Sequence, residues 1–118
     1  MDGIVYLCQN KGQNMDIEFD KGYLRELYEY GVCQDKKHRF QPSVVKKYQK
    51  RIDTLACAVR IENLFPLNSL NLERLEGTEN RFSIRVDLQY RLEFELSVIN
   101  DKPMLTLCNI LELSNHYK

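Results

Sequence analysis

Apolar and polar residues alternate through most of the last third of the chain. The alternation covers residues 82–87, 90–96 and 105–113. Because successive side chains of a strand point to opposite faces of a sheet, this pattern predicts three strands. Turn residues at 88–89 and 100–103 separate them, which favours antiparallel neighbours. The third segment is apolar on both sides for several residues, so we expect it at the centre of the sheet.

The first half of the chain has one short alternating segment and two helical patterns. Residues 15–20 (MDIEFD) alternate apolar and acidic side chains, which predicts a strand. Helical spacing of apolar residues predicts a helix over 20–30, with Asp20 as its N-cap and Gly31 as its stop. Pro42 favours the first turn of a second helix, which we expect to end near Arg60. The apolar stripe of that helix consists of Val44, Val45, Tyr48, Ile52, Leu55, Ala56 and Val59.

The order of these elements predicts the fold class. A strand, two helices and three further strands indicate an α+β domain, in which an N-terminal strand and a helix hairpin pack on a small antiparallel sheet. Residues 62–77 contain Pro66 and several leucines, and we expect them to be irregular to extended, with the leucines packed on the core. We assign residues 15–118 to one domain. Residues 1–14 are weakly patterned, and they are either a flexible extension or lie before a natural start at Met15.

The charges of the chain balance, but they are unevenly distributed. Lys and Arg total 17, as do Asp and Glu, so the formal net charge is zero. The stretch from Lys36 to Arg51 nevertheless contains seven Lys or Arg and no acid. Such a stretch can be a footprint for nucleic acid, or simply a solvated helix face.

Composition excludes several other classes of protein. No apolar run approaches the roughly 20 residues of a membrane span, and the N-terminus lacks the basic start of a signal peptide. The four cysteines have no CxxC spacing and no nearby His pair, so we expect no metal site. Without an export signal we expect a cytoplasmic protein with free thiols.

The polar positions of the predicted strands carry the candidate chemistry. Ser83, Arg85 and Arg91 fall on polar positions, and His116 follows the last strand. Guanidinium groups on one face of a sheet suit binding of a phosphate. The alternative is ordinary cross-strand pairing of the arginines with nearby acids.

The chain also resembles the RelE/ParE superfamily of toxins from bacterial toxin–antitoxin pairs, and within it the HigB branch, the plasmid maintenance system killer proteins. Four segments carry the resemblance, which spans roughly residues 15–118: IEFDKGYLRELYEYG, LNLERLEG, SIRVDLQYRLEF and ILELSNHYK. Their order and spacing over the whole domain, and no single motif, support it.

The resemblance implies a function and partners. Active members of the family are ribosome-dependent mRNA endoribonucleases that use no metal or other cofactor. A ribose 2′-OH attacks the adjacent phosphate and leaves a cyclic phosphate and a free 5′-OH. The implied partners are a HigA-like helix-turn-helix antitoxin, the ribosome and mRNA.

The resemblance also implies roles for individual residues. Arg91 matches the hairpin arginine that contacts the scissile phosphate, and Arg85 matches a basic position on the preceding strand. His116 and Tyr117 lie where members carry the basic or aromatic residues of the site. Residues assigned to contacts with RNA or the ribosome are Lys46, Lys47, Lys50, Arg51 and Ser83. Where some members have a site histidine four residues before the glycine of the L-x-G motif, this chain has Glu73.

Two other functions share this fold. One is a ParE-like inhibitor of DNA gyrase that does no chemistry. The other is a degenerate toxin that keeps only its antitoxin-binding surface. Arg85, Arg91 and His116 favour the nuclease among the three.

Overall fold

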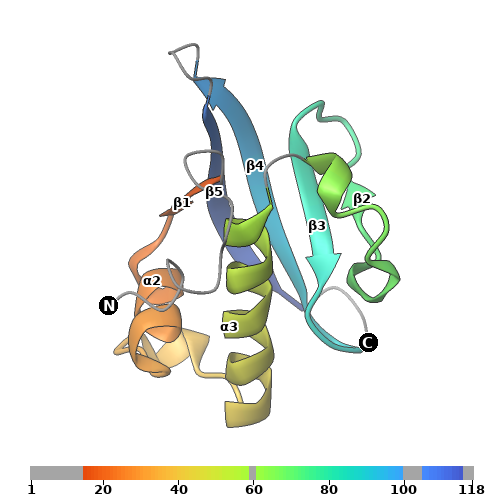
Figure 1. Cartoon of the computed structure of the whole chain (residues 1–118). Coiled ribbons are helices and arrows are strands. Elements are labelled where there is room, and N and C mark those ends of the chain that lie inside the picture. Colours follow the sequence, from red (N-terminus) through yellow and green to blue (C-terminus); the bar gives the residue numbers. More distant parts are fainter. Residues whose placement is uncertain (1–14, 59–60, 100–104, 116–118) are drawn as a thin grey trace.

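The computed structural model describes residues 15–58, 61–99 and 105–115. The predicted extension 1–14, the turn predicted at 100–103 and the candidate residues His116 and Tyr117 lie outside the described residues. Five strands form one sheet in the order β1-β5-β4-β3-β2, and two α-helices lie on one side of it (Figure 1). The α+β class with a helix pair packed on a sheet is therefore confirmed.

The two helices follow the apolar stripes of the sequence. Helix α2 (Gly22–Tyr30) buries Tyr23, Leu24 and Leu27, and it ends at Gly31, whose φ of 78° places it in the left-handed region. The predicted cap Asp20 is wrong, because Lys21 occupies the N-cap position and its side chain makes no capping hydrogen bond.

Helix α3 (Pro42–Cys57) begins at Pro42, as the sequence predicts. It ends at Cys57, before the predicted end near Arg60, and Ala58 already has an extended backbone. A short 3-10 turn, η1 (Lys36–His38), lies between the two helices.

The sheet is mixed and not purely antiparallel as expected. Strand β1 (Asp16–Phe19) runs parallel to β5 (Leu105–Ser114). Strand β5 also pairs antiparallel with β4 (Arg91–Ile99), so the predicted interior position of the last strand is confirmed. Alternation of apolar and polar residues shows which side chains share a face of a strand. It does not show whether the strand runs parallel or antiparallel to a partner far away in the sequence, so the parallel pair of β1 and β5 could not be predicted from it.

The remaining strands form the other edge of the sheet. Strand β3 (Arg81–Arg85) pairs with β4, and the two-residue β2 (Glu73–Arg74) pairs with β3. The sequence predicts irregular to extended chain where β2 lies, without a separate strand. Before it, the 3-10 turns η2 (Ile61–Asn63) and η3 (Asn68–Leu70) fold the segment back, and Leu64 and Leu70 are buried.

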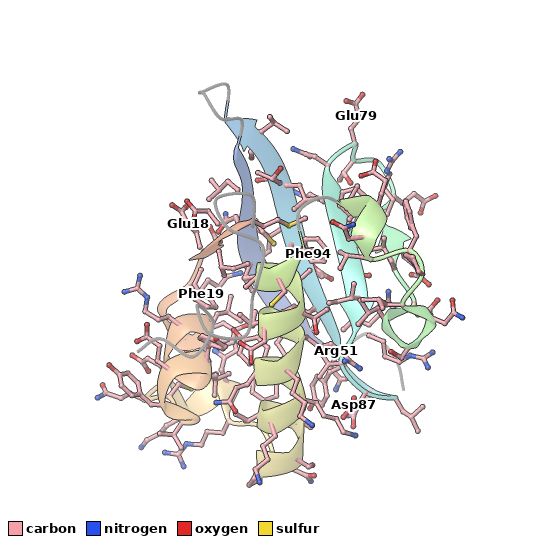
Figure 2. The ribbon with its side chains drawn as sticks, in the orientation of Figure 1. Glu18, Phe19, Arg51, Glu79, Asp87 and Phe94 are labelled. Carbon is pink, nitrogen blue, oxygen red and sulfur yellow. The ribbon has the colours of Figure 1, made fainter. Side chains whose placement is uncertain are left out.

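The core lies between the helices and one face of the sheet. Phe94 of β4 and Tyr48 of α3 are among its fully buried side chains, and Figure 2 shows Phe94 between α3 and the sheet. Paired residues of neighbouring strands share a face, so Phe82 and Ile84 of β3 join Phe94 and Leu92 in this core. The residues that alternate with these along β3 and β4 point to the other face of the sheet, away from the helices.

The cysteines differ from the expectation of four free thiols. Cys33 and Cys108 are free, and burial raises the pKa of the Cys108 thiol to about 12. Cys57, at the end of α3, is disulfide-bonded. Neither described helix is long and apolar enough to cross a membrane.

Candidate functional site

The face of the sheet that points away from the helices brings the predicted arginines together. In the β3–β4 register, Arg85 stands opposite Arg91, and Ser83 opposite Glu93. Glu73 of β2 stands opposite Ser83 and so shares this face. We call Glu73, Ser83, Arg85, Arg91 and Glu93 together the arginine face.

Arg91 is the most constrained residue of the arginine face. Its side chain is 3% exposed. Its Nε donates to the Ser83 hydroxyl oxygen at 2.9 Å, and its Nη2 donates to the Ser83 carbonyl oxygen at 3.0 Å. The same Nη2 donates to the carbonyl oxygen of Asn71 at 2.6 Å. A buried charge requires such partners, and these contacts hold the guanidinium in one orientation.

The backbone of Asn71 is shaped for this contact. Asn71 follows η3 and has a φ of 47°, and it is the non-glycine residue with positive φ in the described part of the chain. Asparagine tolerates the left-handed region better than most residues. With this backbone conformation the carbonyl oxygen of Asn71 accepts from Arg91, and β2 begins only two residues later. The segment before β2 therefore covers the Arg91 guanidinium.

Glu73 places a carboxylate beside the buried arginine. Its Oε1 lies 3.8 Å from Nη2 of Arg91, and its side chain is 50% exposed. Glu73 thus reaches both the guanidinium and solvent. It was not among the predicted site residues, although the resemblance marked its position as that of a site histidine in some relatives.

Arg85 is exposed and lies directly across from Arg91. Like charges on opposite residues repel, and placing two guanidiniums here raises the local affinity for an anion. The backbone of Arg85 is fixed from the helix side, because Nε of Arg51 donates to its carbonyl oxygen at 2.7 Å. Figure 2 shows Arg51 reaching from α3 toward the end of β3. Burial lowers the pKa of the Arg51 guanidinium below its usual value.

The hairpin turn next to Arg85 and Arg91 is closed by a side chain. Oδ1 of Asp87 accepts hydrogen bonds from the backbone amides of Gln89 and Tyr90, both at 2.8 Å. The amide of Val86 donates to the carbonyl oxygen of Tyr90 at 2.9 Å. This Asx-type turn fixes the register that sets Arg85 against Arg91.

The other predicted site residues are scattered. Lys46, Lys47 and Lys50 are exposed on α3, away from the arginine face. Ser83, predicted to contact RNA, is 3% exposed and faces Arg91. His116 and Tyr117 are outside the described residues. The structure therefore unites Arg85 and Arg91, adds Glu73 to them, and leaves the lysines apart.

Acidic residues balance the arginines on this side of the sheet. Glu93, half-buried, stands opposite Glu112 of β5, which is exposed. In the described ranges no group of three or more His, Cys, Asp or Glu side chains is arranged to hold a metal ion.

A solved structure has a similar fold. The structure is similar to that of a YoeB/ParE toxin from Agrobacterium tumefaciens, with a TM-score of 0.52 at 14% sequence identity, over 87% of this chain and 100% of that one. No curated protein matches the chain.

The sequence identifies the family more closely. Residues 17–105 match the family described as the RelE-like toxin of the type II toxin–antitoxin system HigB. The chain belongs to this family. It is therefore a RelE-like toxin of a type II toxin–antitoxin system, and an antitoxin is its expected partner.

Proposed function

We propose that this toxin is a ribosome-dependent mRNA endoribonuclease that acts in the cytoplasm and is held inactive by a HigA-like helix-turn-helix antitoxin. The observation that carries the proposal is the arrangement of Glu73, Arg85 and Arg91 on one face of the sheet. A carboxylate and two guanidiniums supply a proton acceptor and a site for a phosphate. The family membership supports the same reaction class.

In this reaction the ribose 2′-OH attacks the adjacent phosphorus. The half-exposed Glu73 carboxylate takes the 2′-OH proton, and the bond from phosphorus to O5′ breaks. The products are a 2′,3′-cyclic phosphate and a 5′-OH, and the reaction needs no metal. The pentacoordinate phosphorus gains negative charge on its oxygens, which the guanidiniums stabilise because they are fixed before the reaction.

The two arginines divide these tasks according to their exposure. Exposed Arg85 makes the direct contact with the phosphate. Buried Arg91 adds positive charge next to it, and its hydrogen bonds hold Ser83 and the backbone at Asn71 in place. The leaving 5′-oxygen requires a proton, and we assign its donation to His116 or Tyr117. A histidine has an ordinary pKa suited to this step.

Exposed lysines of α3 supply binding and not chemistry. Lys46, Lys47 and Lys50 suit phosphate contacts with ribosomal RNA, which give salt-dependent affinity without sequence choice. Arg51 is already bonded to the backbone of β3, so we assign it to positioning Arg85. Since the ribosome can hold the mRNA in place, a short list of catalytic groups is sufficient.

Induced expression with mapping of transcript ends tests the proposal. Wild-type toxin should arrest growth and produce new 5′-OH ends within translated regions only, and Arg85→Ala should do neither at equal protein level. Intact transcripts during growth arrest would refute the nuclease.

A second function has one observation in its favour. Arg91, which resemblance assigns to the scissile phosphate, is 3% exposed, so the domain also suits a toxin that binds without chemistry. Such a toxin would inhibit DNA gyrase, as in the ParE branch, and would cause DNA damage signals with transcripts intact. A degenerate toxin that only binds its antitoxin would give neither result, and would not arrest growth.

A further inference from the structure

A hollow of about 310 Å³ lies between the C-terminal end of α2 and the connection of residues 31–41 that leads to α3. Its apolar lining includes buried Leu27, half-buried Phe40 and Val32, which is 70% exposed. Tyr30, the last residue of α2, is 73% exposed. Large apolar side chains left in solvent next to an apolar hollow indicate a docking surface.

The connection that forms one wall of the hollow is held by its own contacts. Sγ of Cys33 donates to the carbonyl oxygen of His38 at 3.3 Å. Nδ1 of His38 lies 2.8 Å from Oδ2 of Asp35, and the His38 ring stacks on the Tyr23 ring with centroids 3.7 Å apart. The hollow is therefore formed in the free toxin, and a partner does not have to order it on binding.

The rim of the hollow is basic. Lys36 and Arg39 are exposed, and neither forms an ion pair with the described residues. The acids nearest to them in sequence are already engaged, because Asp35 contacts His38 and Glu26 accepts a hydrogen bond from the backbone of the connection. The two cations are thus free to attract carboxylates of a partner.

A protein segment fits this combination better than a nucleic acid does. Contacts with phosphates require exposed cations but no apolar hollow. An apolar side chain that enters the hollow and covers Val32 and Tyr30 is removed from water, and this burial favours association of proteins. The expected protein partner of this chain is an antitoxin.

We propose that the antitoxin docks at this hollow. A segment of the antitoxin inserts an apolar side chain between Leu27 and Phe40, and it places Asp or Glu residues against Lys36 and Arg39. The docking follows from the family membership of the chain and holds whether or not the toxin cleaves mRNA. Because the arginine face points away from the helices, a segment bound here anchors the antitoxin without touching that face.

The affinity of the antitoxin for surface variants of the full-length toxin tests the docking. The probe is the full-length antitoxin purified from the same operon, and calorimetric titration gives the dissociation constant. Tyr30→Ser combined with Val32→Ser should weaken binding about tenfold or more, since apolar anchors carry much of the binding energy. Lys36→Glu combined with Arg39→Glu should also weaken it about tenfold at low salt, and less at high salt, where charges are screened.

Matched substitutions elsewhere on the surface serve as controls. Val98→Ser alters an apolar residue of β4 that is 60% exposed, and Arg25→Glu reverses an exposed charge of α2 outside the lining of the hollow. Both should bind the antitoxin within about twofold of wild type. All of these positions are exposed, so the variants should melt like wild type. Wild-type affinity in either double variant would overturn the proposal.

Hydrogen exchange of the wild-type toxin gives a second measurement that needs no variant. Bound antitoxin should slow the exchange of the backbone amides of residues 32–40. Protection confined to the strands would overturn the proposal. So would double variants that keep their antitoxin affinity and lose binding to ribosomes, since the hollow would then belong to RNA. Binding is measured without mRNA, so a failure of the proposed cleavage leaves both measurements unaffected.

Discussion

Nη2 of Arg91 donates a hydrogen bond to the carbonyl oxygen of Asn71 at 2.6 Å, and this contact joins β4 to the chain just before β2. The contact holds the chain that leads into the edge strand β2 close to Arg91. Glu73, the first residue of β2, follows two residues after Asn71 and therefore lies on the arginine face. The geometry of the candidate site thus depends on a backbone contact between residues 20 positions apart.

The left-handed backbone of Asn71 predicts how substitutions there behave. Asn71→Gly should retain stability to within about 0.5 kcal/mol, because glycine adopts positive φ freely and the carbonyl oxygen stays on Arg91. Asn71→Val should lower the free energy of unfolding by about 1–3 kcal/mol, because a β-branched residue is strained in this region. Urea unfolding of the two variants measures the difference, and equal stabilities would contradict the prediction.

Removal of the Arg91 side chain should first destabilise the fold. Arg91→Ala leaves the buried Ser83 hydroxyl and its carbonyl oxygen without their donor, and each buried unsatisfied group costs about 1–3 kcal/mol. Arg85→Ala, at an exposed position, should change stability by no more than about 0.5 kcal/mol. Thermal melts of both variants check this. If Arg91→Ala melts like wild type, the hydrogen bonds of Arg91 do not stabilise the fold.

Arg51 and Lys50 are neighbours on α3 that should respond differently to substitution. Arg51→Met removes the hydrogen bond to the Arg85 carbonyl oxygen, and it should lower the free energy of unfolding by about 1 kcal/mol, given that this guanidinium is only half-buried. Lys50→Met alters an exposed side chain and should change stability by less than about 0.5 kcal/mol. Equal losses for the two variants would show that Arg51 does not brace β3.

The exposed lysines of α3 predict a salt effect on ribosome binding. Changing Lys46, Lys47 and Lys50 to Gln should reduce the slope of log K against log salt concentration by about 2–3, at about 0.7–0.9 for each lost phosphate contact. The melting temperature should be unchanged, since none of the three is buried. Sedimentation with ribosomes at several salt concentrations measures the slope. An unchanged slope would contradict the prediction and would mean that the three lysines are only a solvated face of α3.

Alkaline pH should weaken the packing of α2 against β5. Burial raises the pKa of Tyr23 from its ordinary value of 10.0 to about 12, and its hydroxyl oxygen accepts a hydrogen bond from the amide of Leu113. A pKa raised by folding means that this contribution is complete below pH 10.0 and is lost as the pH rises toward 12. Tyr23→Phe should therefore show a shallower fall of unfolding free energy over this window than wild type. Tyr30→Phe, at an exposed position, is the control and should follow wild type.

The long helix and the β3–β4 hairpin of this fold could be predicted from the spacing of apolar residues. The stripe of Tyr48, Ile52 and Leu55 predicted α3, and the alternation on each side of Leu88 predicted β3 and β4, because in both cases one face had to be buried. The parallel position of β1 and the two-residue β2 could not be predicted in this way. They depend on pairing with distant chain, and an exposed two-residue strand has no pattern.

The site was predictable in part for the same reason. Alternation places Arg85 and Arg91 on one face, and the β3–β4 register confirms this arrangement. That Arg91 is buried follows from the irregular chain at Asn71, whose path no periodic pattern encodes. Glu73 joins the site only through that path, which is why residue spacing alone did not single it out.

Cleavage of mRNA by purified toxin and translating ribosomes tests the central claim most directly. Wild type and two exposed-site variants, Glu73→Gln and Arg85→Ala, are compared at equal folded concentration, with the products analysed for 2′,3′-cyclic phosphate and 5′-OH ends. The proposed mechanism predicts such ends from wild type, and a loss of about 100-fold or more in rate for Glu73→Gln, as for removal of a general base. Intact mRNA with the wild type, or undiminished cleavage by both variants, would contradict it.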